Sequence, residues 1–205
     1  MPRGVALAAA LLAFFAPAAT AGTWLGAPPA PAIVKGVLRV ELRASTTPVR
    51  LIGSVIPEQA IIGASLDARH YVWAAPTDRG GYCMGMTGPL AVIGGNTCTS
   101  ASGGSWGSFY DCDGAVIMGG RIARSARATA RALEIRSGAA TVRVALDRSH
   151  HGFFIARLNA SLFRTAGALD RRRWPRFAVV DARGRVITPT RVNAGRLQRP
   201  VRVLC

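Results

Sequence analysis

Apolar and polar residues alternate with a period of two along several stretches of this chain. From residue 38 to residue 43, every second residue is apolar and the residues between are charged. Because successive side chains on a strand point to opposite faces, this alternation predicts a half-buried strand. A second strand is predicted over residues 50–56.

Two hairpins are predicted further along the chain. Residues 70–75 and 82–86 are rich in aromatic and β-branched side chains, and the segment between them holds Pro76 and two adjacent glycines. Proline ends a strand ladder and glycine accepts the positive φ of a reversal, so this segment predicts a hairpin turn. Residues 133–136 and 141–146 alternate on either side of a Ser-Gly pair and predict the second hairpin.

The remaining segments complete an all-β pattern. Residues 87–114 are rich in glycine, serine and threonine and predict a long irregular loop that only crosslinks would hold. The apolar runs 153–156 and 177–180 suit buried strands, 162–173 suits a loop or short helix, and 181–185 predicts a turn. Short strands separated by turns, without a strong amphipathic helix, predict a β-sandwich of two antiparallel sheets with a long Gly-rich, disulfide-tied loop.

The N-terminus has the three parts of a secretory signal peptide. A basic start at Arg3 precedes 11 apolar residues (5–15), and Ala19-Thr20-Ala21 supplies a small-x-small cleavage site. The apolar stretch is too short to span a bilayer as a helix, and an uncleaved N-terminal anchor is the alternative. We therefore expect a secreted, extracellular protein with a signal peptide (1–21), a Pro/Ala-rich leader (22–32) and a single β-sandwich domain (33–205), and no membrane span after cleavage.

The charge distribution changes this picture by suggesting a partner. The chain is strongly basic, with a net charge of +16, and from Gly119 onward it holds 19 arginines and four acidic residues. Such a field attracts anionic polymers or cell-surface components, with contact residues expected at Arg171, Arg172, Arg173 and Arg176. A GC-rich coding sequence would also produce this arginine excess. Nucleic acid is not expected as a partner, because the protein is exported and carries no binding motif.

Four cysteines follow the predicted cleavage site. An even number in an exported chain favours two disulfides, and three connectivities are possible. We expect Cys83 to pair with Cys98, which would close the hairpin exit onto the Gly-rich loop. We expect Cys112 to pair with Cys205, which would hold the terminal strand. The cysteines include no closely spaced pair, and the histidines lie far from them in sequence, so a metal site is not expected. No cofactor is expected either.

Several short motifs occur together in one order over roughly residues 50–190. They are the G-G-x-C segment ending at Cys83, the Gly-Gly-Asn-Thr-Cys segment ending at Cys98, the 133–146 hairpin, Gly152-Phe153-Phe154 and the D-x-x-G-R turn at 181–185. In this the chain resembles a group of uncharacterised exported β-rich proteins of high-GC bacteria. The resemblance implies an Ig-like or sandwich domain and supports the Cys83–Cys98 pairing. It implies no catalytic residue.

A hydrolase triad is one catalytic hypothesis. Residues 103–107 fit G-x-S-x-G, and Asp147 followed by His150 or His151 completes the order serine, aspartate, histidine. A nucleophile elbow requires a buried strand before Ser105 and a helix after it, and neither is predicted here. The match is therefore interpreted as chance.

A cell-wall cysteine hydrolase is the alternative function. The segment around Cys112 looks like the D-C-S-G nucleophile motif of such peptidases, with His150 or His151 as the base, although Asp113 stands in place of the serine. A catalytic thiolate needs a helix N-terminus and a nearby base, and no helix is predicted after Cys112. A bridged Cys112 is the preferred interpretation, and His151 is the base in the alternative.

Two further hypotheses concern binding. His150 and His151 would form a pH-sensitive or metal-binding pair only if both faced one side, and a turn is the simpler location. Trp73, Trp106 and Trp174 would stack on sugar rings if exposed, although scattered aromatics are more often core residues. The sequence as a whole predicts a secreted, non-enzymatic binding or structural module of unknown ligand, for which an anionic surface is the candidate.

Overall fold

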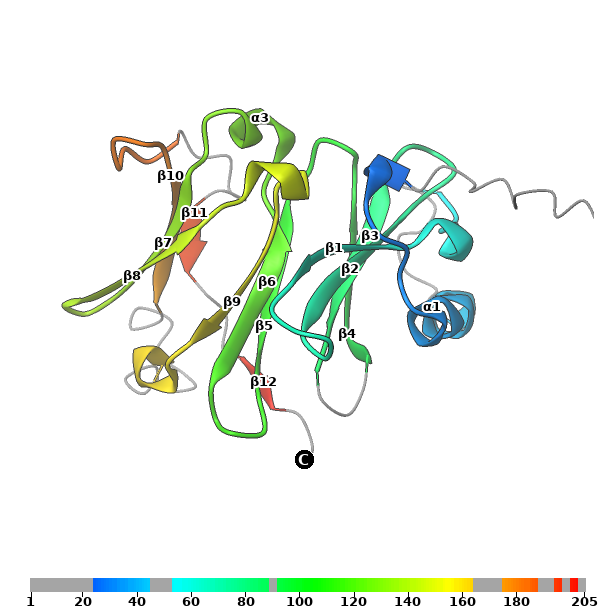
Figure 1. Cartoon of the computed structure of the whole chain (residues 1–205), viewed down its shortest axis with the longest axis horizontal. Coiled ribbons are helices and arrows are strands. Elements are labelled where there is room, and N and C mark those ends of the chain that lie inside the picture. Colours follow the sequence, from blue (N-terminus) through cyan, green and yellow to red (C-terminus); the bar gives the residue numbers. More distant parts are fainter. Residues whose placement is uncertain are drawn as a thin grey trace, which may run out of the picture.

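The computed structural model describes residues 24–44, 53–88, 92–163, 175–187, 194–196 and 200–202. The predicted signal peptide lies outside these residues. The described chain is predominantly β-stranded, and its ladders are antiparallel except for one short parallel pair (Figure 1). The predicted all-β class with antiparallel sheets is therefore confirmed.

The strands of the described residues form three four-stranded sheets. The first sheet has the order β1 (Ile61–Ser65), β2 (Tyr71–Pro76), β3 (Tyr82–Thr87), β4 (Val92–Thr99). The second has the order β12 (Val201–Arg202), β5 (Ser105–Tyr110), β6 (Val116–Arg121), β9 (Phe153–Leu158). The third has the order β11 (Ala194–Arg196), β10 (Arg176–Val180), β7 (Ala132–Ser137), β8 (Ala140–Ala145).

The second sheet lies between the other two, as Figure 1 shows. Ile117 of β6 belongs to a buried cluster shared with Val72 and Met84 of the first sheet. The next residue, Met118, belongs to a cluster shared with Ile135 of the third sheet. Because neighbouring side chains on a strand point to opposite faces, β6 contributes to both cores, and every residue in it is buried.

Glycine allows the first and second sheets to approach closely. A Cβ atom on Gly119 of β6 would lie 2.6 Å from Cγ2 of Val72 and 2.7 Å from Sδ of Met86. A Cβ atom on Gly63 of β1 would lie 2.4 Å from the ring of Phe153. The glycines at these two positions therefore serve the packing of the sheets.

The predicted strand at 38–43 is wrong, because these residues belong to helix α1 (Ala32–Ala44). Val34 and Leu38, four residues apart, are both buried in a cluster with Tyr71 and Trp73 of β2. A spacing of four places side chains on one face of a helix, and this face covers the first sheet. The helix also includes Ala32, the last residue of the predicted leader.

Two other expectations are corrected. Residues 53–56 form no strand; Val55 makes only an isolated bridge to Thr77, and residues 50–52 lie outside the described chain. The irregular loop predicted at 87–114 is wrong, since β4 and β5 occupy much of it. β4 pairs with the preceding strand β3 and β5 with the following strand β6, and the composition of the segment does not reveal this pairing.

Several predictions are confirmed. The two predicted hairpins are β2–β3 and β7–β8, and the apolar runs are β9 and β10. Asp181 makes the predicted turn by accepting the backbone N–H groups of Arg183 and Arg185 at 2.8 and 2.9 Å. Only residues 162–163 of the segment 162–173 are described, and they are the last two residues of a short helical turn, η4 (Ala160–Phe163).

The other helical elements are short and irregular. They are η1 (Trp24–Gly26), η2 (Pro57–Gln59), α3 (Arg124–Arg127) and η3 (Arg148–His150). Among the described helices, none has the length and apolar character needed to cross a membrane.

Candidate functional site

An arginine-bearing surface lies on the outward face of the third sheet. Arg176 of β10 stands directly opposite Arg136 of β7, and on its other side its backbone pairs with that of Arg196 in β11. Arg143 of β8 stands opposite Glu134, two residues from Arg136. Directly paired residues and residues two apart share one face, so Arg136, Arg143 and Arg176 point the same way. We call these three residues the arginine face.

The opposite face of the same sheet is apolar, which fixes the orientation of the arginines. Leu133, Ile135, Phe177 and Val179 alternate with the charged positions and are buried in the core shared with the second sheet. Arg136, Arg143 and Arg176 are exposed. A shift of the strand register by one residue would bury the arginines and expose the core residues. The burial of the apolar residues therefore determines which side of the sheet carries the arginines.

One carboxylate partly neutralises the arginine face. Nε of Arg136 donates a hydrogen bond of 2.6 Å to Oε1 of Glu134. Arg143 donates through Nη2 to the backbone carbonyl of Asp181 at 3.4 Å. Among the described residues, no ion pair engages Arg176 or Arg143, so this surface keeps a net positive charge.

Sequence analysis predicted four contact arginines, and the structure places one of them. Arg176 belongs to the arginine face. Arg171, Arg172 and Arg173 lie outside the described residues. The prediction missed Arg136 and Arg143, because only the strand register shows that they face the same way as Arg176.

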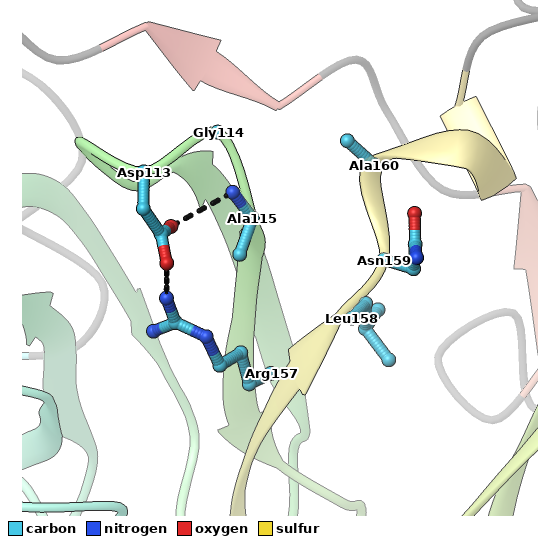
Figure 2. Close-up of a pocket in the computed structure, with 7 residues that line it drawn as sticks. All are labelled: Asp113, Gly114, Ala115, Arg157, Leu158, Asn159 and Ala160. Carbon is cyan, nitrogen blue, oxygen red and sulfur yellow. Dashed lines mark hydrogen bonds and ion pairs between the residues drawn. The ribbon is translucent and has the colours of Figure 1, made fainter.

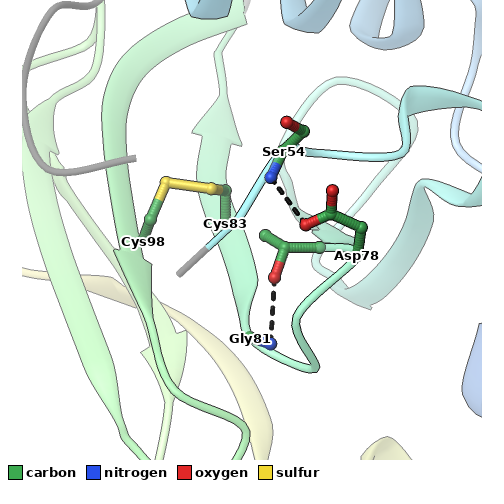
Figure 3. The surroundings of a disulfide bond; sticks show 6 residues. Ser54, Asp78, Gly81, Cys83 and Cys98 are labelled. Carbon is green, nitrogen blue, oxygen red and sulfur yellow. Dashed lines mark hydrogen bonds between the residues drawn. A yellow bond between two sulfur atoms is a disulfide. The ribbon is translucent and has the colours of Figure 1, made fainter. Parts of the chain in front are cut away.

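The Cys83–Cys98 disulfide is confirmed. The two residues stand opposite each other on β3 and β4, and their sulfurs are bonded (Figure 3). Around them, the β2–β3 turn is held by side chains: Thr77 Oγ1 accepts the N–H of Gly81 at 2.9 Å, and Asp78 Oδ1 accepts the N–H of Ser54 at 2.8 Å.

Cys112 lies in the turn between β5 and β6 and is disulfide-bonded. Its predicted partner, Cys205, lies outside the described residues. His151, the proposed base, lies just before β9, at the other end of β6, where Arg121 pairs with Phe153. Six residues of strand separate the two ends by roughly 17 Å. Cys112 and His151 therefore cannot act as nucleophile and base in this structure.

Ser105 does not stand in a nucleophile elbow. It opens β5 and pairs with Arg121, so a strand follows it where an elbow requires a helix. Asp147 accepts hydrogen bonds of 2.8 Å from the N–H and Oγ of Ser149, and its other oxygen lies 3.7 Å from Nε2 of His150. The hydrogen bonds of the described chain do not link Ser105 to either histidine.

The tryptophans are not arranged as a sugar platform. Trp73 is fully buried, and Trp106 packs edge-on against Phe177 with ring centroids 4.5 Å apart. Trp174 lies outside the described residues. His150 and His151 occupy a turn, as expected, and His151 has a positive φ of 50°.

A buried charge network, missed by sequence analysis, lies at the other end of the second sheet. His70 is buried between two carboxylates: Nδ1 lies 2.8 Å from Oδ2 of Asp67, and Nε2 lies 3.3 Å from Oδ2 of Asp111. Arg157 donates to Asp111 at 3.0 Å and also to Asp113. Three segments meet here, the β1–β2 turn, the β5–β6 turn and β9, so no local motif could have revealed the network.

The network lowers the pKa of its carboxyl groups. The hydrogen bond from the His70 side chain, with backbone N–H groups, lowers the pKa of Asp67 to about 2. Burial alone would raise the pKa of Asp111, but the N–H of Cys112, His70 and Arg157 together hold it below its ordinary value. Both groups therefore remain ionised at neutral pH.

A cavity of about 460 Å³ opens beside this network. Figure 2 shows Asp113 and Arg157 on one side and Asn159 on the other, with the backbone of Gly114 and Ala115 between them. The guanidinium of Arg157 points to the Asp113 carboxylate, and Asp113 also accepts the N–H of Ala115 at 2.9 Å. Its charges satisfy one another, so the cavity offers no free catalytic group. The described residues contain no group of three acidic, histidine or cysteine side chains that could hold a metal ion.

Comparison of the chain with protein-family models, with curated proteins and with solved structures finds no match. The geometry described above is therefore the only basis for a functional proposal.

Proposed function

We propose that this chain is a secreted, non-enzymatic β-sandwich module that binds anionic polymers or anionic cell-surface components through the arginine face. The observation that carries the proposal is the register that sets Arg176 directly opposite Arg136. Like charges directly opposite each other on a sheet are destabilising, and a bound polyanion would offset that repulsion.

The chemistry of arginine fits such a ligand. A guanidinium group presents several N–H donors in a planar fork that matches carboxylate, sulfate and phosphate groups. Neighbouring strands lie about 4.8 Å apart, so arginines on β8, β7 and β10 form a ladder across the sheet. An extended polymer with repeated charges can contact several of them at once.

The sandwich and the export are part of the proposal. The core shared by the first and second sheets supports two facing layers, and the Ig-like strand order stays a prediction. The Cys83–Cys98 disulfide is typical of proteins that fold in an oxidising compartment, which supports secretion.

The test compares two triple variants with the same net charge. The face variant carries Arg136→Gln, Arg143→Gln and Arg176→Gln. The control variant carries Arg39→Gln, Arg69→Gln and Arg124→Gln, all exposed and away from this sheet. Salt elution from an anionic polysaccharide column should be much earlier for the face variant than for the control. Equal elution of the two would mean that only the overall charge matters, which would refute the proposal.

A further inference from the structure

A second group of arginines lies at the opposite end of the second sheet from the His70 network. Arg121 ends β6 and is only 3% exposed. Arg127 ends the short helix α3 and is partly buried. Neither belongs to the arginine face: Arg121 contacts Tyr82 of the first sheet, and Arg127 bonds to the carbonyl of Ile122.

The guanidinium of Arg121 is enclosed by aromatic rings. Its central carbon lies 4.6 Å from the ring centroid of Phe153, 4.7 Å from that of Tyr82 and 5.5 Å from that of Trp24. Its Nε donates to the carbonyl of His151 at 3.2 Å. Ring faces attract a cation but do not cancel its charge.

Arg127 has an unsatisfied donor. Its Nε donates to the carbonyl of Ile122 at 3.0 Å. Its Nη2 is buried, and within the described chain it has no hydrogen-bond partner. A buried donor without a partner costs stability, and the cost is larger for a charged group.

Neither arginine has a carboxylate partner among the described residues. Burial, together with the nearby charge of Arg127, lowers the pKa of Arg121 to about 10. Burial also lowers the pKa of Arg127. At neutral pH both groups are charged, so two partly desolvated cations repel each other. An anion between or beside them would remove that cost.

One side of the Arg121 guanidinium is covered by a side chain on a short turn. Trp24 belongs to the three-residue turn η1 and is partly exposed, and its ring lies against Tyr82 with centroids 6.0 Å apart. The chain after it is held along β1, where the N–H of Ile62 donates to the carbonyl of Pro28 at 2.8 Å. The Trp24 ring can therefore move without breaking the sheet.

We propose that Arg121 and Arg127 form a binding site for a small oxyanion, such as phosphate or sulfate, closed by the ring of Trp24. The guanidinium fork of Arg127 donates to the oxyanion through its unpaired Nη2. Arg121 supplies a fixed positive charge beneath it. The site is independent of the proposed binding of polymers, since it shares no residue with the arginine face.

The test titrates the full chain with inorganic phosphate at constant ionic strength by isothermal calorimetry. Removing the cover with Trp24→Ala should tighten phosphate binding relative to the unmodified chain. Adding Arg127→Gln to Trp24→Ala should weaken binding by about tenfold or more, because a charged hydrogen bond is lost. Adding Arg124→Gln instead removes the same charge from the same helix and should have much less effect.

The outcomes separate this proposal from others. Equal phosphate affinity in the Arg127→Gln and Arg124→Gln variants would overturn it, because only the general field would then matter. If Arg127→Gln fails to fold, Arg127→Lys keeps the charge without the fork and should still bind phosphate more weakly than Trp24→Ala alone. The triple variant of the arginine face should bind phosphate normally, so either proposal can fail without the other.

Discussion

At the scale of single residues, the most constrained group in the described chain is His70. Its ring lies between Asp67 and Asp111, and Asp111 in turn accepts a hydrogen bond from Arg157. Asp67 and His70 share the turn before β2, so the network joins this turn to the β5–β6 turn and to β9. We interpret it as a structural element, because its charges are satisfied internally.

The network predicts a stability that depends on acid pH. The pKa of Asp67 is about 2 in the folded chain, against an ordinary value of 3.8. A carboxyl with a depressed folded pKa stabilises the protein above its unfolded pKa, and this stabilisation is lost as the pH falls through the folded value. The free energy of unfolding should therefore fall between pH 3.8 and about 2.

The variant Asp67→Asn tests this prediction. It keeps an acceptor for the backbone N–H groups of Arg69 and His70 but removes the titrating charge. Urea unfolding measured at several pH values should show a shallower fall for the variant than for the unmodified chain. Parallel curves for the two proteins would contradict the role given to Asp67.

At the scale of elements, helix α1 shows what alternation can and cannot indicate. A six-residue alternation is compatible with a strand, and the residues 38–43 alone gave no reason to choose otherwise. The deciding feature is the spacing of Val34 and Leu38 against the outer face of β2, where Tyr71 and Trp73 need cover. That requirement belongs to the first sheet, so local sequence could not show it.

The two faces of α1 give a matched test. Leu38 is 1% exposed and Ile33 is 64% exposed. Leu38→Ala should lower the free energy of unfolding by about 2–5 kcal/mol, because it leaves a cavity against the sheet. Ile33→Ala should change it by less than about 0.5 kcal/mol. Chemical denaturation measures both, and similar losses at the two positions would contradict the packing of α1.

The hairpins were predictable and the strands β4 and β5 were not, for a related reason. The β2–β3 and β7–β8 hairpins combine local alternation with a local turn, so all their signals lie in one stretch of sequence. The glycines of β4 and β5 give these segments the composition of a loop, and their strand form comes from pairing with β3 and β6, the strands next to them along the chain. The same contrast holds for the candidate site. The charge content of the sequence predicted Arg176, but only the strand register shows that Arg136 and Arg143 lie on the same face.

At the scale of the whole molecule, three sheets share two cores and one crosslink ties the first sheet together. Cys83 and Cys98 are 15 residues apart in sequence. Closing a loop of this length restricts the unfolded chain and contributes about 3 kcal/mol on the loop-entropy account. The double variant Cys83→Ala/Cys98→Ala should therefore unfold at a lower temperature in calorimetry. An unchanged unfolding temperature would contradict a stabilising role for this disulfide.

The charge of the molecule is arranged unevenly over these sheets. The acidic residues Asp67, Asp111 and Asp113 gather at one end of the middle sheet, where Arg157 and His70 neutralise them. The outward face of the third sheet keeps its positive charge. A polyanion is therefore expected to bind in one orientation, along the arginine face.

The most direct measurement of this claim is the salt dependence of binding to a soluble, defined polyanion. Each arginine that contacts the polymer releases counter-ions, so the logarithm of affinity should fall linearly with the logarithm of salt concentration. The account predicts a clearly shallower slope for the variant Arg136→Gln/Arg143→Gln/Arg176→Gln than for the unmodified chain. Identical slopes and affinities for the two proteins would contradict it.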